Sequence, residues 1–176
     1  VLSVGTVQPR KNYARLIEAF VRSGLGQAQD GVDLVIAGGR GWLYQDVLEA
    51  AARHSDHVRI LGFVEDADLP ALYRQAATFA FPSLYEGFGL PVLEAMACGV
   101  PVVCSNVSSL PEVAGAAAVQ VDPLDVDGLA GALARLNEDA ELRQDLAARG
   151  REQAAKFTWQ SAARQLLNAF TALAAR

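Results

Sequence analysis

Short runs of β-branched and other apolar residues alternate along this chain with stretches whose apolar side chains recur at helical spacing. This alternation limits the possible folds more than any other feature. The runs that predict strands are residues 1–5, 33–37, 58–61, 78–81, 100–104 and 117–121. A strand that is followed by a helix returns to the sheet as a parallel neighbour through a right-handed crossover. The sequence therefore predicts an α/β fold, in which helices cover both faces of a parallel sheet of about six strands.

The expected helices lie between these strands and in the tail of the chain. Helical spacing of apolar residues predicts them around residues 13–21, 43–54, 69–75, 91–98, 126–133, 142–146 and 158–176. Thr158 is expected to cap the last helix, whose apolar stripe around Phe170 should be partly uncovered and prone to self-association. A chain of 176 residues suits one hydrophobic core, so residues 1–176 are expected to form a single Rossmann-like domain.

The charge balance is acidic, with 20 Asp and Glu against 15 Lys and Arg, a net charge of −5. Such a field repels nucleic acid and anionic membranes, so nucleic acid is not an expected partner. Any phosphate site must then be a local cluster of donors. Cys98 and Cys104 lie in apolar stretches without metal-binding spacing. Buried, unlinked thiols are typical of a reducing compartment, which predicts a cytoplasmic location.

The chemistry is expected in loops, because ligands of such sheets bind at the carboxyl ends of the strands. The strand-to-helix loops to consider are residues 5–12, 38–42, 62–68 and 82–91. In the last of them, Gly87 and Gly89 allow a sharp turn and close approach of the backbone to a ligand. Pro91 suits the start of a helix, and the free amides of a helix start favour an anion.

Two glutamates flank this glycine loop. Glu86 and Glu94 are eight residues apart, so both can line one crevice, with the anion-binding amides between them. Carboxylates beside an anion site are suited to accept hydrogen bonds from neutral hydroxyls, such as those of ribose and hexose. The alternative is that Glu94 caps its own helix and that Glu86 is solvated.

Two cations follow the first strand. Arg10 and Lys11 end the loop Gly5-Thr-Val-Gln-Pro-Arg-Lys-Asn12, at the functional edge of the predicted sheet. An adjacent Arg and Lys suit a diphosphate, because Arg offers a planar fork and Lys a point charge. The alternative is a solvated basic pair with Asn12 as a helix N-cap.

Taken together, these residues resemble the family 4 retaining glycosyltransferases, which have the GT-B fold. The run from Glu86 to Glu94 is similar to that family's E-x7-E motif, and Arg10-Lys11-Asn12 to its phosphate loop. Residues 109–113, Ser-Leu-Pro-Glu-Val, are similar to a third shared stretch. The resemblance extends in order over nearly all of the chain.

The resemblance implies a role for each matching residue. Glu86, Arg10 and Lys11 would be the catalytic residues, with the cations on the donor diphosphate and Glu86 on hydroxyls of the transferred sugar. Glu94 would bind the ribose, and the amides of residues 88–90 would lie near the sugar and the phosphate. The full donor-binding set would be Gly5, Arg10, Lys11, Gly38, Gly39, Phe63, Val64, Glu86, Gly87, Phe88, Gly89, Leu90 and Glu94. Phe63 and Val64 would lie beside the nucleobase.

The activity implied is retaining hexosyl transfer from a nucleotide-diphospho-sugar, GDP-mannose being slightly favoured, to a glycan, lipid or small-molecule acceptor. No cofactor and no metal would be required. Enzymes of that family have two Rossmann-like domains, so this chain would be the C-terminal half and inactive alone. The N-terminal acceptor domain would be its partner and could associate peripherally with a membrane. Alternatives are a nucleotide-sugar-binding module without catalysis, or a GT-B epimerase or phosphorylase.

Two acidic triplets, Asp66-Ala-Asp68 and Asp125-Val-Asp127, have the D-x-D pattern that holds a divalent metal in other glycosyltransferases. Each precedes an amphipathic stretch, where an aspartate is expected to cap a helix and to meet the positive end of its dipole. The sequence therefore predicts two caps rather than a metal site.

Other residues are assigned structural roles. Gly38-Gly-Arg-Gly41 resembles a dinucleotide-binding fingerprint, but Tyr44 occupies the position of its last glycine. A hydride-transferring enzyme is therefore not expected. His54 and His57 are interpreted as surface residues, and Trp42 and Trp159 as packing residues.

Overall fold

Six parallel strands form a single sheet in the order β3-β2-β1-β4-β5-β6 in the computed structural model, which describes residues 1–28 and 31–174. The strands are β1 (Leu2–Val4), β2 (Leu34–Ala37), β3 (Val58–Gly62), β4 (Phe79–Phe81), β5 (Val102–Ser105) and β6 (Ala118–Val121). The predicted parallel sheet is confirmed. β5 begins two residues later than expected, after Pro101, which has no amide hydrogen for a neighbouring strand.

Helices connect the strands and extend the chain beyond the sheet. They are α1 (Tyr13–Arg22), α2 (Gln45–Arg53), α3 (Leu69–Arg74), α4 (Leu90–Ala97), α5 (Leu110–Ala114), α6 (Val126–Glu138), α7 (Ala140–Ala154) and α8 (Trp159–Ala174), with short 3-10 helices η1 (Pro9–Lys11) and η2 (Leu25–Gln27). The sequence pattern did not predict α5, because five residues are too few to display helical periodicity.

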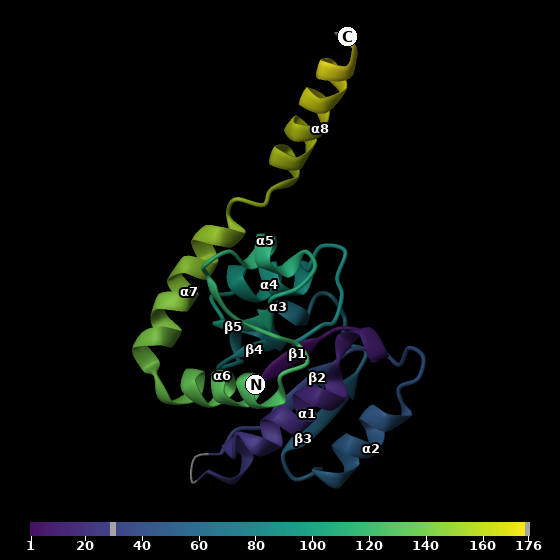
Figure 1. Ribbon diagram of the computed structural model, residues 1–176, viewed down its shortest axis with the longest axis vertical. Helices are drawn as coiled ribbons and strands as arrows, with labels where there is room; N and C mark the ends of the chain where they lie inside the picture. Colours follow the sequence, from purple (N-terminus) through teal and green to yellow (C-terminus); the bar gives the residue numbers. More distant parts are fainter. Residues whose placement is uncertain (29–30, 175–176) are drawn as a thin grey trace.

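The strands supply alternate side chains to two hydrophobic cores. Ala80 and Val103 face the core under α1, α2 and α6, whereas Phe79 and Phe81 face the core under α3, α4 and α5. Figure 1 shows the sheet between these helices. Complete burial of a side chain such as Phe79, which is 0% exposed, contributes about 1.5–3 kcal/mol. The predicted Rossmann-like arrangement, with helices on both faces, is therefore confirmed.

The sheet reverses its order beside β1, which lies between β2 and β4. The chain first winds from β1 towards β3 and later crosses to β4 on the other side. In such sheets the loops at this reversal diverge at the carboxyl ends of the strands and leave a crevice for a ligand. The loop after β1 carries Arg10 and Lys11, and the loop after β4 carries Glu86. The topology thus brings these predicted site residues to one edge.

A glycine allows the loops after β1 and β2 to touch. A Cβ atom added to Gly38 would lie 2.0 Å from the carbonyl oxygen of Gly5, so no other residue fits without a backbone shift. The contact continues as a short parallel ladder, in which the Val7 amide donates to Gly39 and the Gly41 amide donates to Val7. Gly5, Gly38 and Gly39 consequently lie together at the carboxyl edge of the sheet, where folds of this kind leave a crevice.

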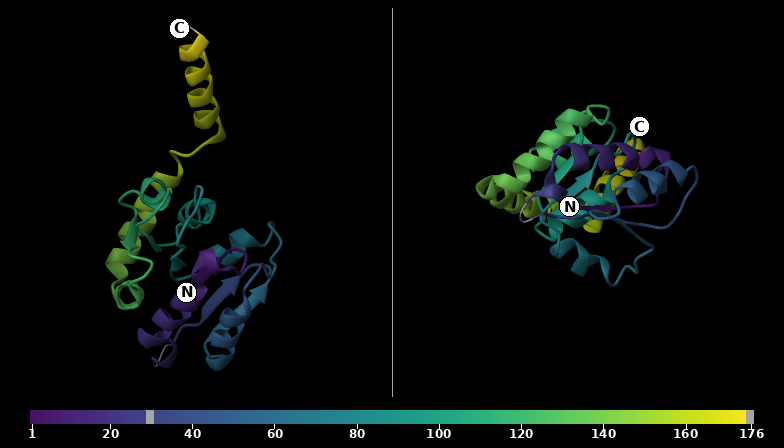
Figure 2. Two further views of the ribbon diagram at one scale, coloured as in Figure 1. Left: turned by 45° about the vertical axis from the view of Figure 1, so that its right-hand side comes forward. Right: turned by 90° about the horizontal axis from the view of Figure 1, so that it is seen from below.

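Helix α8 projects away from the rest of the molecule (Figures 1 and 2). None of its residues is buried, and Leu166, Leu167, Phe170 and Leu173 are each at least 58% exposed. The Thr158 hydroxyl accepts a hydrogen bond from the Ser161 amide, which confirms the predicted cap. Trp159 is 84% exposed and Trp42 is 60% exposed, so their interpretation as packing residues is wrong for the chain by itself. No helix of the described residues is long and apolar enough to cross a bilayer.

The two D-x-D triplets differ in the structure. Asp125 has extended backbone geometry, and its carboxylate accepts a hydrogen bond of 2.9 Å from the Gly128 amide at the start of α6, as predicted. Asp68 forms no such bond, so the cap predicted for residues 66–68 is wrong. Pro70 occupies the second position of α3 and has no amide to donate, and the Ala71 amide bonds to the backbone oxygen of Asp68.

This difference gives a matched pair of substitutions. Asp125→Ala is expected to lower the free energy of unfolding by about 1 kcal/mol, because the Gly128 amide loses its acceptor. Asp68→Ala is expected to change it by less than about 0.5 kcal/mol, as surface substitutions usually do. Urea denaturation of both variants measures the two effects. Equal losses would contradict the assignment of a cap to Asp125 alone.

Candidate functional site

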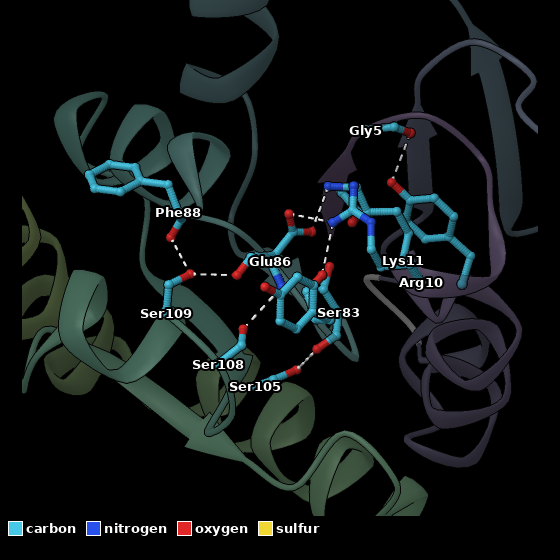
Figure 3. Close-up of polar contacts among 12 residues, drawn as sticks. Gly5, Arg10, Lys11, Ser83, Glu86, Phe88, Ser105, Ser108 and Ser109 are labelled. Carbon is cyan, nitrogen blue, oxygen red and sulfur yellow. Dashed lines mark hydrogen bonds and ion pairs between the residues drawn. The ribbon is translucent and has the colours of Figure 1, made fainter.

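A buried ion pair joins Glu86 to the two cations of the first loop at the carboxyl edge of the sheet. Arg10 Nη1 lies 2.5 Å from Glu86 Oε2, and Lys11 Nζ lies 2.8 Å from Glu86 Oε1. Glu86 is 8% exposed and Lys11 is 6% exposed. Figure 3 shows the three charged groups converging from the two loops. The structure therefore unites the predicted catalytic residues, and the alternative of a solvated Glu86 and a solvated basic pair is wrong.

Lys11 is held on several sides. Its ammonium lies 4.3 Å from the centre of the Phe81 ring, a geometry that stabilises a cation. A Cβ atom on Gly5 would lie 2.8 Å from Lys11 Cε, so this glycine makes room for the side chain. The Tyr13 hydroxyl donates a 2.9 Å hydrogen bond to the Gly5 carbonyl and fixes that loop. Burial lowers the pKa of Lys11, while the Glu86 carboxylate opposes the shift by favouring the charged amine.

Two opposing effects act on the pKa of the Glu86 carboxyl. Burial raises its pKa, but the hydrogen bonds from Lys11 and Arg10 outweigh burial and bring the pKa below its ordinary value of 4.5. Glu86 is consequently ionised at neutral pH. A buried carboxylate is tolerated because two cations compensate its lost hydration.

The backbone of the glycine loop is fastened by the segment that follows β5. The Ser108 hydroxyl accepts a 3.0 Å hydrogen bond from the Glu86 amide. The Ser109 hydroxyl lies 3.0 Å from the Glu86 carbonyl oxygen and 2.7 Å from that of Phe88, and donates to them (Figure 3). Sequence reasoning noted Ser109 only as part of a shared stretch. A hydrogen bond from this hydroxyl to a loop 21 to 23 residues earlier in the chain leaves no periodic pattern in the sequence.

The structure also contradicts the alternative role of Asn12 as a helix N-cap. It adopts the left-handed backbone conformation, with φ of 61°, and its side chain caps no helix. Its amide nitrogen donates to the carbonyl oxygens of Pro82, at 3.0 Å, and Pro123, at 2.7 Å. Asn12 therefore ties the cationic loop to the loops after β4 and β6.

The second glutamate lies on α4. Glu94 is exposed, and its Oε2 accepts a 2.8 Å hydrogen bond from the Tyr73 hydroxyl. The alternative that Glu94 caps its own helix is wrong, because the N-cap residue of α4 is Gly89 and no side chain caps the helix. Burial and the neighbouring Glu94 charge together raise the pKa of Tyr73, so this tyrosine remains a hydrogen-bond donor.

The remaining predicted donor residues line the same edge. Gly89, with φ of 110°, starts α4, and Gly87 has open space where a side chain would stand. Phe88 and Leu90 are 44% and 52% exposed. Phe63 is 71% exposed after β3, while Val64 packs partly against the core. The described residues contain no cluster of three His, Cys, Asp or Glu side chains that could hold a metal ion.

The lowered pKa of Glu86 predicts a dependence of stability on pH. A carboxyl with a lowered pKa in the folded state stabilises the fold above its unfolded pKa, and this contribution is lost as the pH falls towards the folded value. Glu86→Gln should therefore be less stable than the wild type at pH 7, and the gap should narrow below pH 4.5. Urea denaturation at several pH values is the measurement. The exposed Glu49→Gln is the control, and a gap that is constant with pH would refute the assignment.

Comparison with known proteins agrees with this geometry. Residues 1–153 match the family described as Glycosyl transferases group 1. The chain belongs to this family. It is 45% identical over 98% of its length to O-antigen chain mannosyltransferase B of Escherichia coli, of which it covers 45%. The resemblance inferred from the glutamate and cation motifs is thereby confirmed.

Solved structures of related proteins share the fold of this chain. Sucrose-phosphate synthase of Thermosynechococcus elongatus superposes with a TM-score of 0.78 at 29% identity, over 99% of this chain and 45% of that one. Anabaena HepE, solved in complex with UDP, superposes with a TM-score of 0.81 at 25% identity, over 97% of this chain and 48% of that one. The fold is that of the C-terminal domain of GT-B enzymes, as predicted. The chain spans less than half the length of these relatives.

Proposed function

We propose that this chain is the C-terminal donor-binding domain, residues 1–176, of a retaining hexosyltransferase that uses a nucleotide-diphospho-sugar without a metal. The observation that carries the proposal is the convergence of Arg10 and Lys11 on Glu86 at the reversal of the sheet. Two cations, a carboxylate and a glycine loop at a helix start combine the groups that a diphosphate and a sugar require.

The cations suit the diphosphate. Arg10 is 35% exposed at its side chain, so its guanidinium is accessible from the crevice while one nitrogen holds Glu86. The amides at the start of α4 lie on the same loop as Glu86, and the helix dipole adds to their attraction for an anion. Arg10 and Lys11 bring two positive charges to one edge of an acidic chain, and Glu86 balances one of them. Charge that develops on the leaving diphosphate would be stabilised here, the task that a metal ion performs in other enzymes.

The carboxylates suit hydroxyl groups. An ionised Glu86 only accepts hydrogen bonds, and sugar hydroxyls can donate them. Glu94 is exposed and oriented by Tyr73, which fits a contact with ribose. Phe63 stands exposed after β3, where a nucleobase can pack on its ring, with Val64 beside it. Neither carboxylate is required as a general base.

The sugar is proposed to be mannose, carried as GDP-mannose. The support is the Gln8-Pro9-Arg10-Lys11-Asn12 sequence and the mannosyltransferase name of the Escherichia coli relative. Transfer to a glycan, lipid or small-molecule acceptor would need a second domain across the crevice, because alignment of two reactants contributes about 7–11 kcal/mol to lowering a barrier. We also propose that the enzyme is cytoplasmic and that its second domain contacts a membrane surface peripherally.

The proposal predicts where phosphate affinity resides. Replacing Arg10 and Lys11 together by Ala should weaken GDP binding by about 2–4 kcal/mol, because charge-assisted hydrogen bonds to the phosphates are lost. Arg22→Ala is the control, since this exposed arginine pairs with Glu18 and Asp127 away from the crevice. Calorimetry with GDP, UDP and ADP measures the affinities, and circular dichroism verifies folding. Unchanged affinity in the double variant would refute the assignment.

Metal independence is a separate prediction. Nucleotide affinity should stay within about twofold when EDTA replaces Mg²⁺ or Mn²⁺, because Arg10 and Lys11 supply the positive charge. Titration of the nucleotide with and without EDTA is the measurement. If EDTA abolishes binding and Mn²⁺ restores it, the diphosphate is held through a metal and the proposal is wrong on this point.

A further inference from the structure

Ser109 departs from the usual behaviour of a serine at a helix start. It occupies the N-cap position of α5, where a serine normally accepts a hydrogen bond from an amide of the first turn. Its side chain makes no such cap, and its own backbone is already helical, with φ of −79° and ψ of −13°. The single hydroxyl hydrogen is instead directed at two carbonyl oxygens of the glycine loop, those of Glu86 and Phe88.

These two bonds determine where the next amides point. In a trans peptide the carbonyl and the following N–H point in opposite directions, and the described residues contain no cis peptide. Because the Glu86 and Phe88 carbonyls face Ser109, the amides of Gly87 and Gly89 face away from it. Among the described residues, no hydrogen bond has either of these amides as its donor. Ser109 therefore aligns two free N–H groups on one side of the loop.

Leu110, the residue after Ser109, packs against the same loop. A Cβ atom on Gly89 would lie 2.7 Å from Leu110 Cδ2, so the loop rests directly on the first residue of α5. Gly89 also has a φ of 110°, a conformation that other residues rarely adopt. The loop is thus fixed by packing at Gly89 and by hydrogen bonds on either side of Gly87.

We infer that Ser109 is a positioning residue for the donor, which holds the Gly87 and Gly89 amides in the orientation that receives the sugar-side phosphate. The inference rests on the proposed function. Ser109 itself need not touch the ligand. Two preoriented N–H donors bind an anion without the cost of ordering the loop, which is how oxyanion sites gain their strength.

The test compares two variants of the same shape. Ser109→Thr retains a hydroxyl, whereas Ser109→Val replaces it by a methyl group. GDP carries the second phosphate and GMP lacks it, so calorimetry with both nucleotides isolates the contact. We expect Ser109→Val to bind GDP about tenfold more weakly and GMP within about twofold of the wild type. Ser109→Thr should restore GDP affinity. Ser23→Ala, which removes a serine-to-carbonyl bond remote from the crevice, should change neither.

A second measurement observes the amides directly. In a titration with inorganic pyrophosphate, the backbone amide NMR signals of Gly87 and Gly89 should shift in the wild type and in Ser109→Thr, and much less in Ser109→Val. Equal weakening of GDP and GMP in Ser109→Val, or unaltered binding of both, would overturn the role of Ser109. If the wild type itself fails to prefer GDP, UDP or ADP over the monophosphates, the proposed function fails instead.

Discussion

The pairing of buried Glu86 with Arg10 and Lys11 is the interaction on which the crevice depends. A carboxylate that is 8% exposed cannot remain ionised unless nearby cations and donors replace its water. The two cations come from the loop after β1 and the carboxylate from the loop after β4, so the pair joins the two halves of the sheet across its reversal. Lys11 is equally dependent on Glu86, because its own burial disfavours its charge.

The backbone around this pair is fixed by small polar side chains. Asn12 donates to the carbonyls of Pro82 and Pro123, Ser108 accepts from the Glu86 amide, and Ser109 donates back to the same loop. Each bond satisfies a backbone group that the loop would otherwise leave unpaired. Together they hold the glycine loop in place independently of any ligand. Loops fastened in this way are suited to electrostatic stabilisation, since the donors need not reorganise when charge develops.

The paired charges and the exposed apolar side chains lie in different regions of the molecule. Arg10 and Lys11 lie together at the edge where the strands end and pair there with Glu86, within a chain of net charge −5. Helix α8, by contrast, projects away from the rest of the molecule, and all its apolar residues are exposed. Contiguous exposed apolar residues of this kind are typical of interaction surfaces. The chain spans less than half the length of the relatives it matches.

The sequence by itself determined the succession of strands and helices along the chain, the parallel sheet and the loops at which the candidate site lies. It did so because helical and strand periodicities are local, and because the spacing from Glu86 to Glu94 around a glycine loop is a local pattern as well. Only the tertiary structure decided that Glu86 is buried against Arg10 and Lys11, of which Lys11 is 75 residues away in the chain. It also decided that Asp68 caps nothing while Asp125 does, and that Ser109 turns from its own helix to the glycine loop. These outcomes depend on distant backbone groups and on the position of a proline, and the free energy of a buried charge is set by neighbours that folding alone assembles.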